Sequence, residues 1–304
     1  MFPTSVRSIL FTPHHASPRC CAVVTIDGDK VTVETESGGK RQEIVVPADE
    51  CYHTNHGADT PDHCMLVHLS PPTLLENTRA RFAADKIYTY VGDILVAINP
   101  FKWIKGIYDE SVMKQCEGKK LHNTACGPHC FSISERAFVV LKKTEKSQCV
   151  VVSGESGAGK TETNRQLMNY LVYRGSTPGV TNELTQKIMD ANPILESFGN
   201  AKTTRNKNSS RFGRYVLVRF SADYKVIGAQ VRTFLLERSR VTAASNEGER
   251  AYHVLYQIIL DGTYCQPTDP TKHRYTSLSG CTTVDTIDDL ESVSYTHLTL
   301  PTKA

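Results

Sequence analysis

The sequence predicts an α/β protein, and three consecutive features of one stretch support this class. Three β-branched residues, Val150–Val152, are typical of the end of a buried parallel strand. A glycine-rich segment, Gly154–Thr161, follows them directly. Apolar residues at helical spacing then run from Thr161 to Tyr173, and one face carries Leu167, Met168, Leu171 and Val172. A strand, a glycine loop and a helix in this order are typical of an α/β fold.

The glycine-rich segment fits the pattern G-x-x-x-x-G-K-[ST] of a phosphate-binding loop. Gly154, Gly157 and Gly159 can adopt backbone angles that side chains forbid, so successive N–H groups can face one concavity. The positive end of the following helix favours phosphate oxygens there. Lys160 can then reach the β- and γ-phosphates, and the Thr161 hydroxyl can bind Mg²⁺. A glycine turn that matches by chance is disfavoured, because the flanking strand and helix patterns are also present.

Length and charge exclude several classes of protein. The chain has 304 residues, enough for one large or two ordinary domains, and 39% of them are hydrophobic, which supports a packed core. Its 35 basic and 32 acidic residues give a formal net charge of +3, too balanced to indicate a nucleic-acid or anionic-membrane partner. No stretch reaches the roughly 18 apolar residues of a membrane span, and residues 1–10 lack the apolar run of a secretory signal.

Ten cysteines are scattered along the chain. A chain of this length does not need disulfides for its stability, so we expect a reduced, cytoplasmic protein. Two clusters, at residues 51–64 and 122–130, combine cysteine with histidine. Neither has the paired C-x₂-C spacing of a structural zinc site, so loop and core positions are favoured over metal binding there.

The N-terminal part changes character twice. Residues 1–19 carry three prolines and no periodicity, which predicts a flexible lead-in. The hairpin signals Asp27–Asp29 and Ser37–Gly39 separate strand-like runs at 22–26, 30–35 and 43–46. These runs predict a small antiparallel, barrel-like module over residues 20–50, and residues 51–68 are expected to be a linker.

Further periodic segments alternate between the two element types. Helices are expected at 74–84, 110–116, 135–143, 182–198 and 247–260. Ser134 is expected to cap the third of these. Strands are expected at 87–91, 94–98, 215–220 and 226–236.

A polar run, Asn200–Gly213, is dense in hydroxyl and amide side chains. It could be a solvated loop without a function. Alternatively it is a switch, a segment that becomes ordered when Ser210 meets Mg²⁺ and when Ser209 and Asn206 meet the γ-phosphate. Composition alone leaves both interpretations open.

Four motifs resemble the myosin motor domain and stand in the family's order. They are Gly154–Thr161 (GESGAGKT), Asn192–Thr203 (NPILESFGNAKT), Asn206–Gly213 (NKNSSRFG) and Leu235–Val241 (LLERSRV). Asn99–Trp103 with Tyr108 resembles the purine-binding loop of that family, and residues 22–47 resemble the SH3-like barrel that precedes many myosin motors. The resemblance covers about residues 22–290 and favours an unconventional class over a muscle-type one.

The resemblance implies a P-loop NTPase core with a mixed central sheet flanked by helices, preceded by a small SH3-like β-barrel. It divides the chain into a lead-in at 1–19, the barrel at 20–50, an N-terminal portion of the motor domain at 51–291, and a non-native tail at 292–304. It also implies an actin-based motor ATPase that uses ATP and Mg²⁺, associates with the cytoskeleton in the cytoplasm, and binds light chains or calmodulin only through a region beyond residue 304.

The resemblance further implies a role for each residue of the site. Nucleotide would be held by the loop residues Gly154, Glu155, Ser156, Gly157, Ala158, Gly159, Lys160 and Thr161, with Asn99 and Tyr108 flanking the base. Mg²⁺ would be bound by Thr161 and Ser210. The catalytic set would be Lys160, Ser156, Asn206, Ser209 and Arg211, of which Asn206 and Ser209 hold the γ-phosphate end and Arg211 pairs with a glutamate of a second switch.

The chain departs from the family pattern in two places. Residues 162–164 read Glu-Thr-Asn where the family usually has Glu-Asn-Thr, so they stay outside the predicted site. No D-x-x-G-[FY]-E second switch follows Arg211, so its partner is expected to be absent from this chain. The chain alone is therefore expected to lack full turnover.

Three functions are compatible with these observations. The first is the ATP-binding front part of an actin-based motor ATPase, and the second is a truncated scaffold that holds ATP without turnover. The third is another phosphate-loop phosphotransferase, such as a small-molecule kinase, which has no reason to carry NKNSSRFG and LLERSRV downstream. Single-turnover hydrolysis separates the first two, and an acceptor-dependent phosphotransfer assay separates the third.

Overall fold

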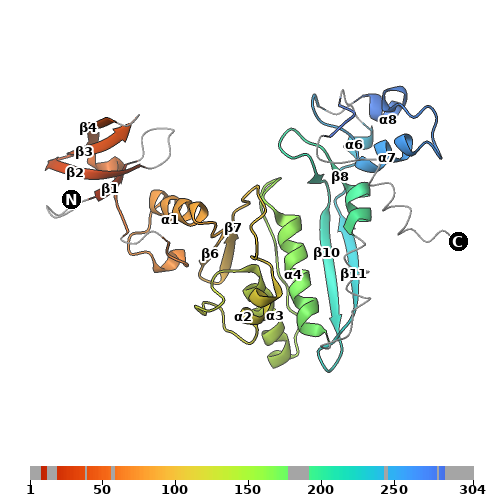
Figure 1. The fold of residues 1–304 in the computed structure, drawn as a ribbon, viewed down its shortest axis with the longest axis horizontal. Coiled ribbons are helices and arrows are strands. Elements are labelled where there is room, and N and C mark those ends of the chain that lie inside the picture. Colours follow the sequence, from red (N-terminus) through yellow and green to blue (C-terminus); the bar gives the residue numbers. More distant parts are fainter. Residues whose placement is uncertain are drawn as a thin grey trace. The chain divides into compact units, whose positions relative to one another are not determined.

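The computed structural model describes residues 8–11, 19–37, 40–55, 59–176, 192–242, 246–278 and 281–284. The chain, drawn as a ribbon in Figure 1, divides into two compact units, Met1–Arg136 and Ala137–Ala304. Each unit has a hydrophobic cluster of its own. The expected tail at 292–304 and most of the helix expected at 182–198 lie outside the described residues; residues 192–199 are helical.

The first unit opens on a five-stranded antiparallel sheet with the strand order β4-β3-β2-β1-β5. Its strands are β1 (Ser8–Phe11), β2 (Arg19–Asp27), β3 (Lys30–Ser37), β4 (Lys40–Pro47) and β5 (Cys51–His53). Alternating side chains form its core, in which Val31 and Val33 are fully buried. Gly28 turns the β2–β3 hairpin with a φ of +57°, a backbone angle that favours glycine.

This sheet contains the three strands that the sequence predicts and two that it does not. β1 lies within the expected lead-in, and β5 lies within the expected linker. Both are recruited by backbone pairing: Ile9 lies opposite Cys21 on β2 and opposite His53 on β5. Side-chain periodicity gives no signal for strands of three or four residues. The bounds that the sequence predicts for this module therefore leave out β1 and β5.

The rest of the first unit consists of short elements. They are η1 (Ala48–Glu50), η2 (His63–Met65), α1 (Pro71–Ala83), β6 (Tyr88–Val91), β7 (Ile94–Ala97), α2 (Glu110–Cys116) and α3 (Cys130–Thr144), whose last turns belong to the second unit. α3 begins at Cys130 rather than at residue 135, so the expected cap Ser134 is a buried residue inside the helix. The His129 ring takes the capping position instead, because its Nδ1 accepts a hydrogen bond from the Phe131 N–H at 3.1 Å.

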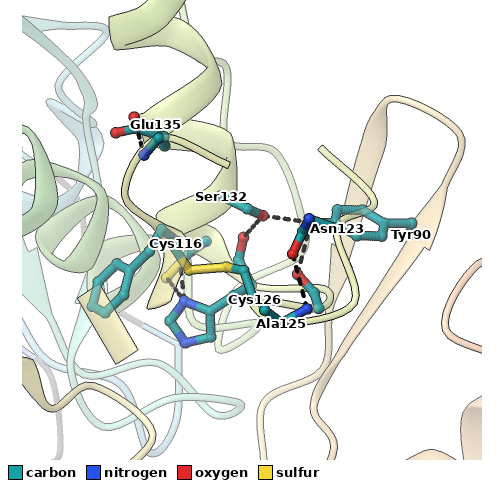
Figure 2. The surroundings of a disulfide bond; sticks show 12 residues. Tyr90, Cys116, Asn123, Ala125, Cys126, Ser132 and Glu135 are labelled. Carbon is teal, nitrogen blue, oxygen red and sulfur yellow. Dashed lines mark hydrogen bonds between the residues drawn. A yellow bond between two sulfur atoms is a disulfide. The ribbon is translucent and has the colours of Figure 1, made fainter. Parts of the chain in front are cut away.

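A disulfide joins Cys116, at the end of α2, to Cys126, just before α3 (Figure 2). The two Cα atoms are 4.8 Å apart, within the usual range for a disulfide. The loop that it closes is also held by the Gly118 N–H, which donates to the Glu135 carboxylate at 2.9 Å. The expectation of a wholly reduced chain is wrong for this pair. Chain length bears on whether a disulfide is needed, and not on which thiols the fold brings together.

The second unit is built around α4 (Lys160–Gly175), which lies beside the antiparallel ribbon of β10 (Gly213–Phe220) and β11 (Val226–Phe234) (Figure 1). Helix and ribbon meet where Gly175 contacts Val226, since a Cβ added to Gly175 would lie 2.4 Å from Val226 Cγ2. The smaller elements are β8 (Asn200–Ala201), β9 (Ser209–Ser210), α6 (Ser239–Thr242), α7 (His253–Asp261), η3 (Pro270–Lys272) and α8 (Arg274–Ser277). Among the described helices, none is long and apolar enough to cross a bilayer.

Two expected elements of the second unit differ from the structure. The strand expected at Val150–Val152 is not formed: Val151 is 81% exposed, and none of the described strands pairs with it. β-branched residues favour a strand, but a parallel strand forms only where neighbours complete its hydrogen bonds. The helix expected from residue 247 begins at His253, because Gly248 turns the chain with a φ of +78° and Tyr252 is still extended.

Candidate functional site

The glycine loop, Gly154–Thr161, leads directly into the N-terminus of α4. Gly159 is the N-cap residue with a φ of +93°, and Gly157 has a φ of +84°; both angles favour glycine. The Thr163 N–H bonds back to the Gly159 carbonyl at 2.9 Å, so the regular helical pattern starts at once. The first turn of any α-helix presents N–H groups that lack helical acceptors, and the positive end of the helix dipole lies there. The loop therefore has the geometry of an anion site.

Lys160 folds back over the glycine loop. Its Nζ donates to the carbonyl oxygens of Gly154 at 2.7 Å and Glu155 at 2.8 Å. Both acceptors are neutral, whereas a phosphate oxygen is charged and makes a stronger, charge-assisted hydrogen bond. The ammonium group is thus held close to the loop by contacts that an anion can replace. The Glu155 side chain is exposed to solvent and lies 3.9 Å from Arg205.

The segment Asn206–Gly213, which we call the switch segment, consists mostly of turns and irregular backbone and is anchored by the two-residue strand β9. Its strand β9 pairs with β8, with Ser209 opposite Ala201, and Ser209 is only 2% exposed. The Arg211 N–H donates to the carbonyl of Gly199 at 2.9 Å. These backbone hydrogen bonds fix the direction in which its hydroxyl side chains point.

The structure brings the glycine loop and the switch segment together at two pairs of hydroxyl groups. Ser156 Oγ lies 2.9 Å from Ser209 Oγ, and Thr161 Oγ1 lies 3.4 Å from Ser210 Oγ. Asn206 is also close, since a Cβ added to Gly157 would lie 3.9 Å from its Nδ2. Residues about 50 positions apart in the sequence thus form two sides of one site.

The residues predicted to flank a base lie in the first unit. Asn99 Oδ1 accepts a hydrogen bond from the Phe101 N–H at 2.9 Å, and the Tyr108 hydroxyl lies 2.8 Å from the Tyr88 hydroxyl. Their role beside a base therefore stays a prediction.

Arg211 has a carboxylate partner within this chain, although this partner is not the second-switch glutamate that the resemblance implies. Its Nε donates to Glu237 Oε2 at 2.5 Å. Glu237 belongs to the motif LLERSRV, but sequence reasoning did not place it at the site. The signal that would have found it is strand register: Gly213 lies opposite Phe234, so the residues that flank the β10–β11 ribbon meet at its open end.

Glu237 is shared between two arginines. Besides Arg211, it accepts a hydrogen bond from Arg240 Nε at 2.8 Å. Burial opposes ionisation of Glu237, but the hydrogen bonds from Arg240 and Arg211 outweigh it and lower the pKa of this carboxyl below its ordinary 4.5. Glu237 is therefore a carboxylate at neutral pH, and it neutralises part of the positive charge beside the glycine loop.

The family model of the myosin head (motor domain) matches residues 60–302, which is most of the chain. The chain belongs to the myosin family. It is 43% identical over 82% of its length to Myosin heavy chain 95F of Drosophila melanogaster, 38% over 90% to Myosin-13 of Arabidopsis thaliana, and 38% over 78% to Myosin ID heavy chain of Dictyostelium discoideum. It covers 20%, 19% and 22% of these proteins, so it spans about a fifth of the length of the curated relatives it matches.

This myosin chain also anchors its switch segment through a buried histidine. Arg250 Nη2 lies 2.8 Å from His253 Nδ1, and His253 Nε2 lies 3.1 Å from Asn208 Oδ1. Because a guanidinium can only donate, Nδ1 is the acceptor and Nε2–H donates to Asn208. Burial, and to a smaller extent the neighbouring Arg250 charge, lower the pKa of His253 to about 3. The ring is therefore neutral in the folded myosin chain.

We expect the stability of this myosin chain to fall as the pH drops below 6.5. Between pH 6.5 and about 3 the unfolded chain binds a proton at His253 that the folded chain does not, so each such proton costs about 1.4 kcal/mol of unfolding free energy per pH unit. Urea unfolding at pH 7.5, 6.5 and 5.5 measures this slope. In His253→Gln the dependence of the unfolding free energy on pH should lack the contribution of this one proton, about 1.4 kcal/mol per pH unit. Equal slopes in both proteins would show that His253 is not the titrating group.

Proposed function

We propose that this chain binds ATP with Mg²⁺ between its glycine loop and its switch segment, as the nucleotide-binding front part of an actin-based motor ATPase. The single observation that carries the proposal is the meeting of two hydroxyl pairs, Ser156 with Ser209 at 2.9 Å and Thr161 with Ser210 at 3.4 Å. A phosphate chain that enters at the glycine loop would extend toward the switch segment. Membership of the myosin family makes an unrelated phosphotransferase the weaker alternative.

The residues present fit a magnesium ion. Mg²⁺ prefers oxygen ligands at about 2.1 Å, so two of its ligands can be at most about 4.2 Å apart. The Thr161 and Ser210 hydroxyl oxygens, 3.4 Å apart, satisfy this limit and are of the ligand type that Mg²⁺ accepts. A bound Mg²⁺ would neutralise charge on the β- and γ-phosphates.

We propose the roles of the other residues from the resemblance to the family. The backbone of Gly154–Thr161 would hold the phosphate chain, and Lys160 would contact the β- and γ-phosphates. Asn206 and Ser209 would hold the γ-phosphate end with Ser156 nearby, and Arg211 would complete the catalytic set. Asn99 and Tyr108 would flank the base.

Family membership supports a proposal for the activity of the longer parent protein. The parent protein would couple ATP hydrolysis to movement on actin filaments in the cytoplasm and associate with the cytoskeleton. Light chains or calmodulin would bind outside this chain. We also propose that the sheet of β1–β5 is an SH3-like barrel, because it is small and antiparallel and its strands β1 to β4 pair in chain order.

Titration with a fluorescent ATP analogue, with and without Mg²⁺, tests the proposal. We expect saturable binding that Mg²⁺ strengthens, and we expect Ser210→Ala to lose about tenfold in affinity with Mg²⁺ but little without it, because it removes one proposed metal ligand. Ser239→Ala, a serine at the start of α6, is the matched control. No saturable binding, or equal Mg²⁺ dependence in Ser210→Ala and wild type, would contradict the proposal.

A further inference from the structure

Glu237 lies at the end of a chain of contacts that reaches the glycine loop. Its carboxylate accepts from Arg211 Nε at 2.5 Å, and Arg211 Nη1 donates to Ser209 Oγ at 3.2 Å. Ser209 Oγ in turn lies 2.9 Å from Ser156 Oγ. One carboxylate is thus connected through one guanidinium to the hydroxyl pair where the two sides of the site meet.

Glu237 is held firmly from its other side. Arg240, whose side chain is only 6% exposed, donates to Glu237 Oε2 at 2.8 Å and to Glu249 Oε2 at 3.3 Å. The Glu237 backbone is fixed as well, since its N–H donates to the Arg211 carbonyl at 3.0 Å and its carbonyl accepts from the Tyr252 hydroxyl at 2.7 Å. Glu237 therefore has a fixed position from which it can orient Arg211, whose side chain is 27% exposed.

The direction of the hydrogen bond between Arg211 and Ser209 determines where the Ser209 hydroxyl proton can point. A guanidinium has no acceptor, so Ser209 Oγ must accept from Arg211. The Ser209 hydroxyl proton is then left to point at Ser156 Oγ or at an acceptor that enters between the two serines. An oxygen of a γ-phosphate is such an acceptor, whereas ADP has no γ-phosphate.

We propose that Glu237 is a positioning residue for the nucleotide site: it holds Arg211 against Ser209, so that the Ser209 hydroxyl donates toward the γ-phosphate and the site distinguishes ATP from ADP. This inference rests on the proposed function. Glu237 itself touches no substrate and acts through Arg211.

The test compares the affinities of the whole chain for a non-hydrolysable ATP analogue and for ADP, both with Mg²⁺. Glu237→Gln keeps the shape of the side chain and removes its charge, and we expect about tenfold weaker binding of the ATP analogue, with ADP changed less than about twofold. Glu249→Gln is the matched control, since Glu249 also contacts Arg240 but has no contact with Arg211 among those the structure describes. It should leave both affinities within about twofold of wild type.

Two further variants separate positioning from general stability. In an Arg211→Gln background, Glu237→Gln should have no further effect on binding of the ATP analogue, because the residue through which Glu237 acts is gone. Glu237→Asp, which retains the charge, should bind the analogue with an affinity between those of wild type and Glu237→Gln.

The inference is overturned if Glu237→Gln weakens ATP analogue and ADP equally, if Glu249→Gln has the same effect, or if the loss persists in the Arg211→Gln background. Should Glu237→Gln not fold, Glu237→Asp decides: an ATP-to-ADP affinity ratio equal to that of wild type would refute the inference, and a lower ratio would support it. These outcomes differ from failure of the proposed function, in which wild type itself binds neither nucleotide.

Discussion

Lys160→Ala is expected to reduce the affinity of the chain for ATP and ADP at least about a hundredfold, because it removes the charged donor nearest the glycine loop. Both nucleotides should be affected, since both have a β-phosphate. Lys143→Ala, an exposed lysine on α3, is the matched control and should bind both nucleotides as wild type does. Titration of each variant with a fluorescent nucleotide gives the comparison.

The same variant is expected to keep its stability. Lys160 Nζ contacts only carbonyl oxygens of its own loop among the contacts that the structure describes, and no packed side chain depends on them. Thermal unfolding without nucleotide should therefore be within about 2 °C of wild type. Full nucleotide affinity in Lys160→Ala would remove the phosphate-loop assignment, and a large loss of stability would show that the lysine is structural.

Gly175→Ala is expected to lower the free energy of unfolding by about 1–3 kcal/mol through overpacking. The added Cβ would lie 2.4 Å from Val226 Cγ2 and 2.9 Å from the Val226 backbone nitrogen. The valine can rotate, but the backbone of β11 cannot move away without disturbing its pairing with β10. Since α4 carries the glycine loop at its other end, nucleotide affinity should fall together with stability. Urea unfolding followed by circular dichroism measures the effect.

Gly228→Ala is the control on the same strand. A Cβ at Gly228 would meet nothing within 4 Å, so this variant should be as stable as wild type or slightly more stable, because alanine costs less backbone entropy than glycine. If Gly175→Ala and Gly228→Ala behaved alike, the close contact between α4 and β11 would not exist in solution.

Hydrophobic periodicity and turn residues in the sequence predict several helices and hairpins correctly. The helix at Glu110–Cys116 and the hairpin of β6 and β7 have the expected type and nearly the expected bounds. The glycine loop and its helix are also where the sequence places them. The motifs include the four residues whose hydroxyl groups meet at the site, but their order did not point to Glu237, and the roles of all these residues stay predictions.

Features that depend on contacts between distant residues were not predictable in this way. The pairing of Arg211 with Glu237 depends on the register of the β10–β11 hairpin, which the motifs alone do not specify. The disulfide of Cys116 and Cys126 follows from how the loop between α2 and α3 closes. The missing strand at Val150–Val152 shows the converse: a strong local preference gives no strand when the described residues supply no partner.

Hydrogen exchange of the backbone amides tests the central claim, that the glycine loop and the switch segment hold the same triphosphate and Mg²⁺. With MgADP, we expect slower exchange in Gly154–Thr161 and little change in Asn206–Gly213. With Mg²⁺ and a non-hydrolysable ATP analogue, we expect slower exchange in both segments, because Asn206 and Ser209 would hold the γ-phosphate, whereas MgADP would reach the switch segment only through Mg²⁺ at Ser210. If the analogue protected the glycine loop but left the switch segment exchanging as it does with MgADP, the two segments would not share one ligand and the account would be contradicted.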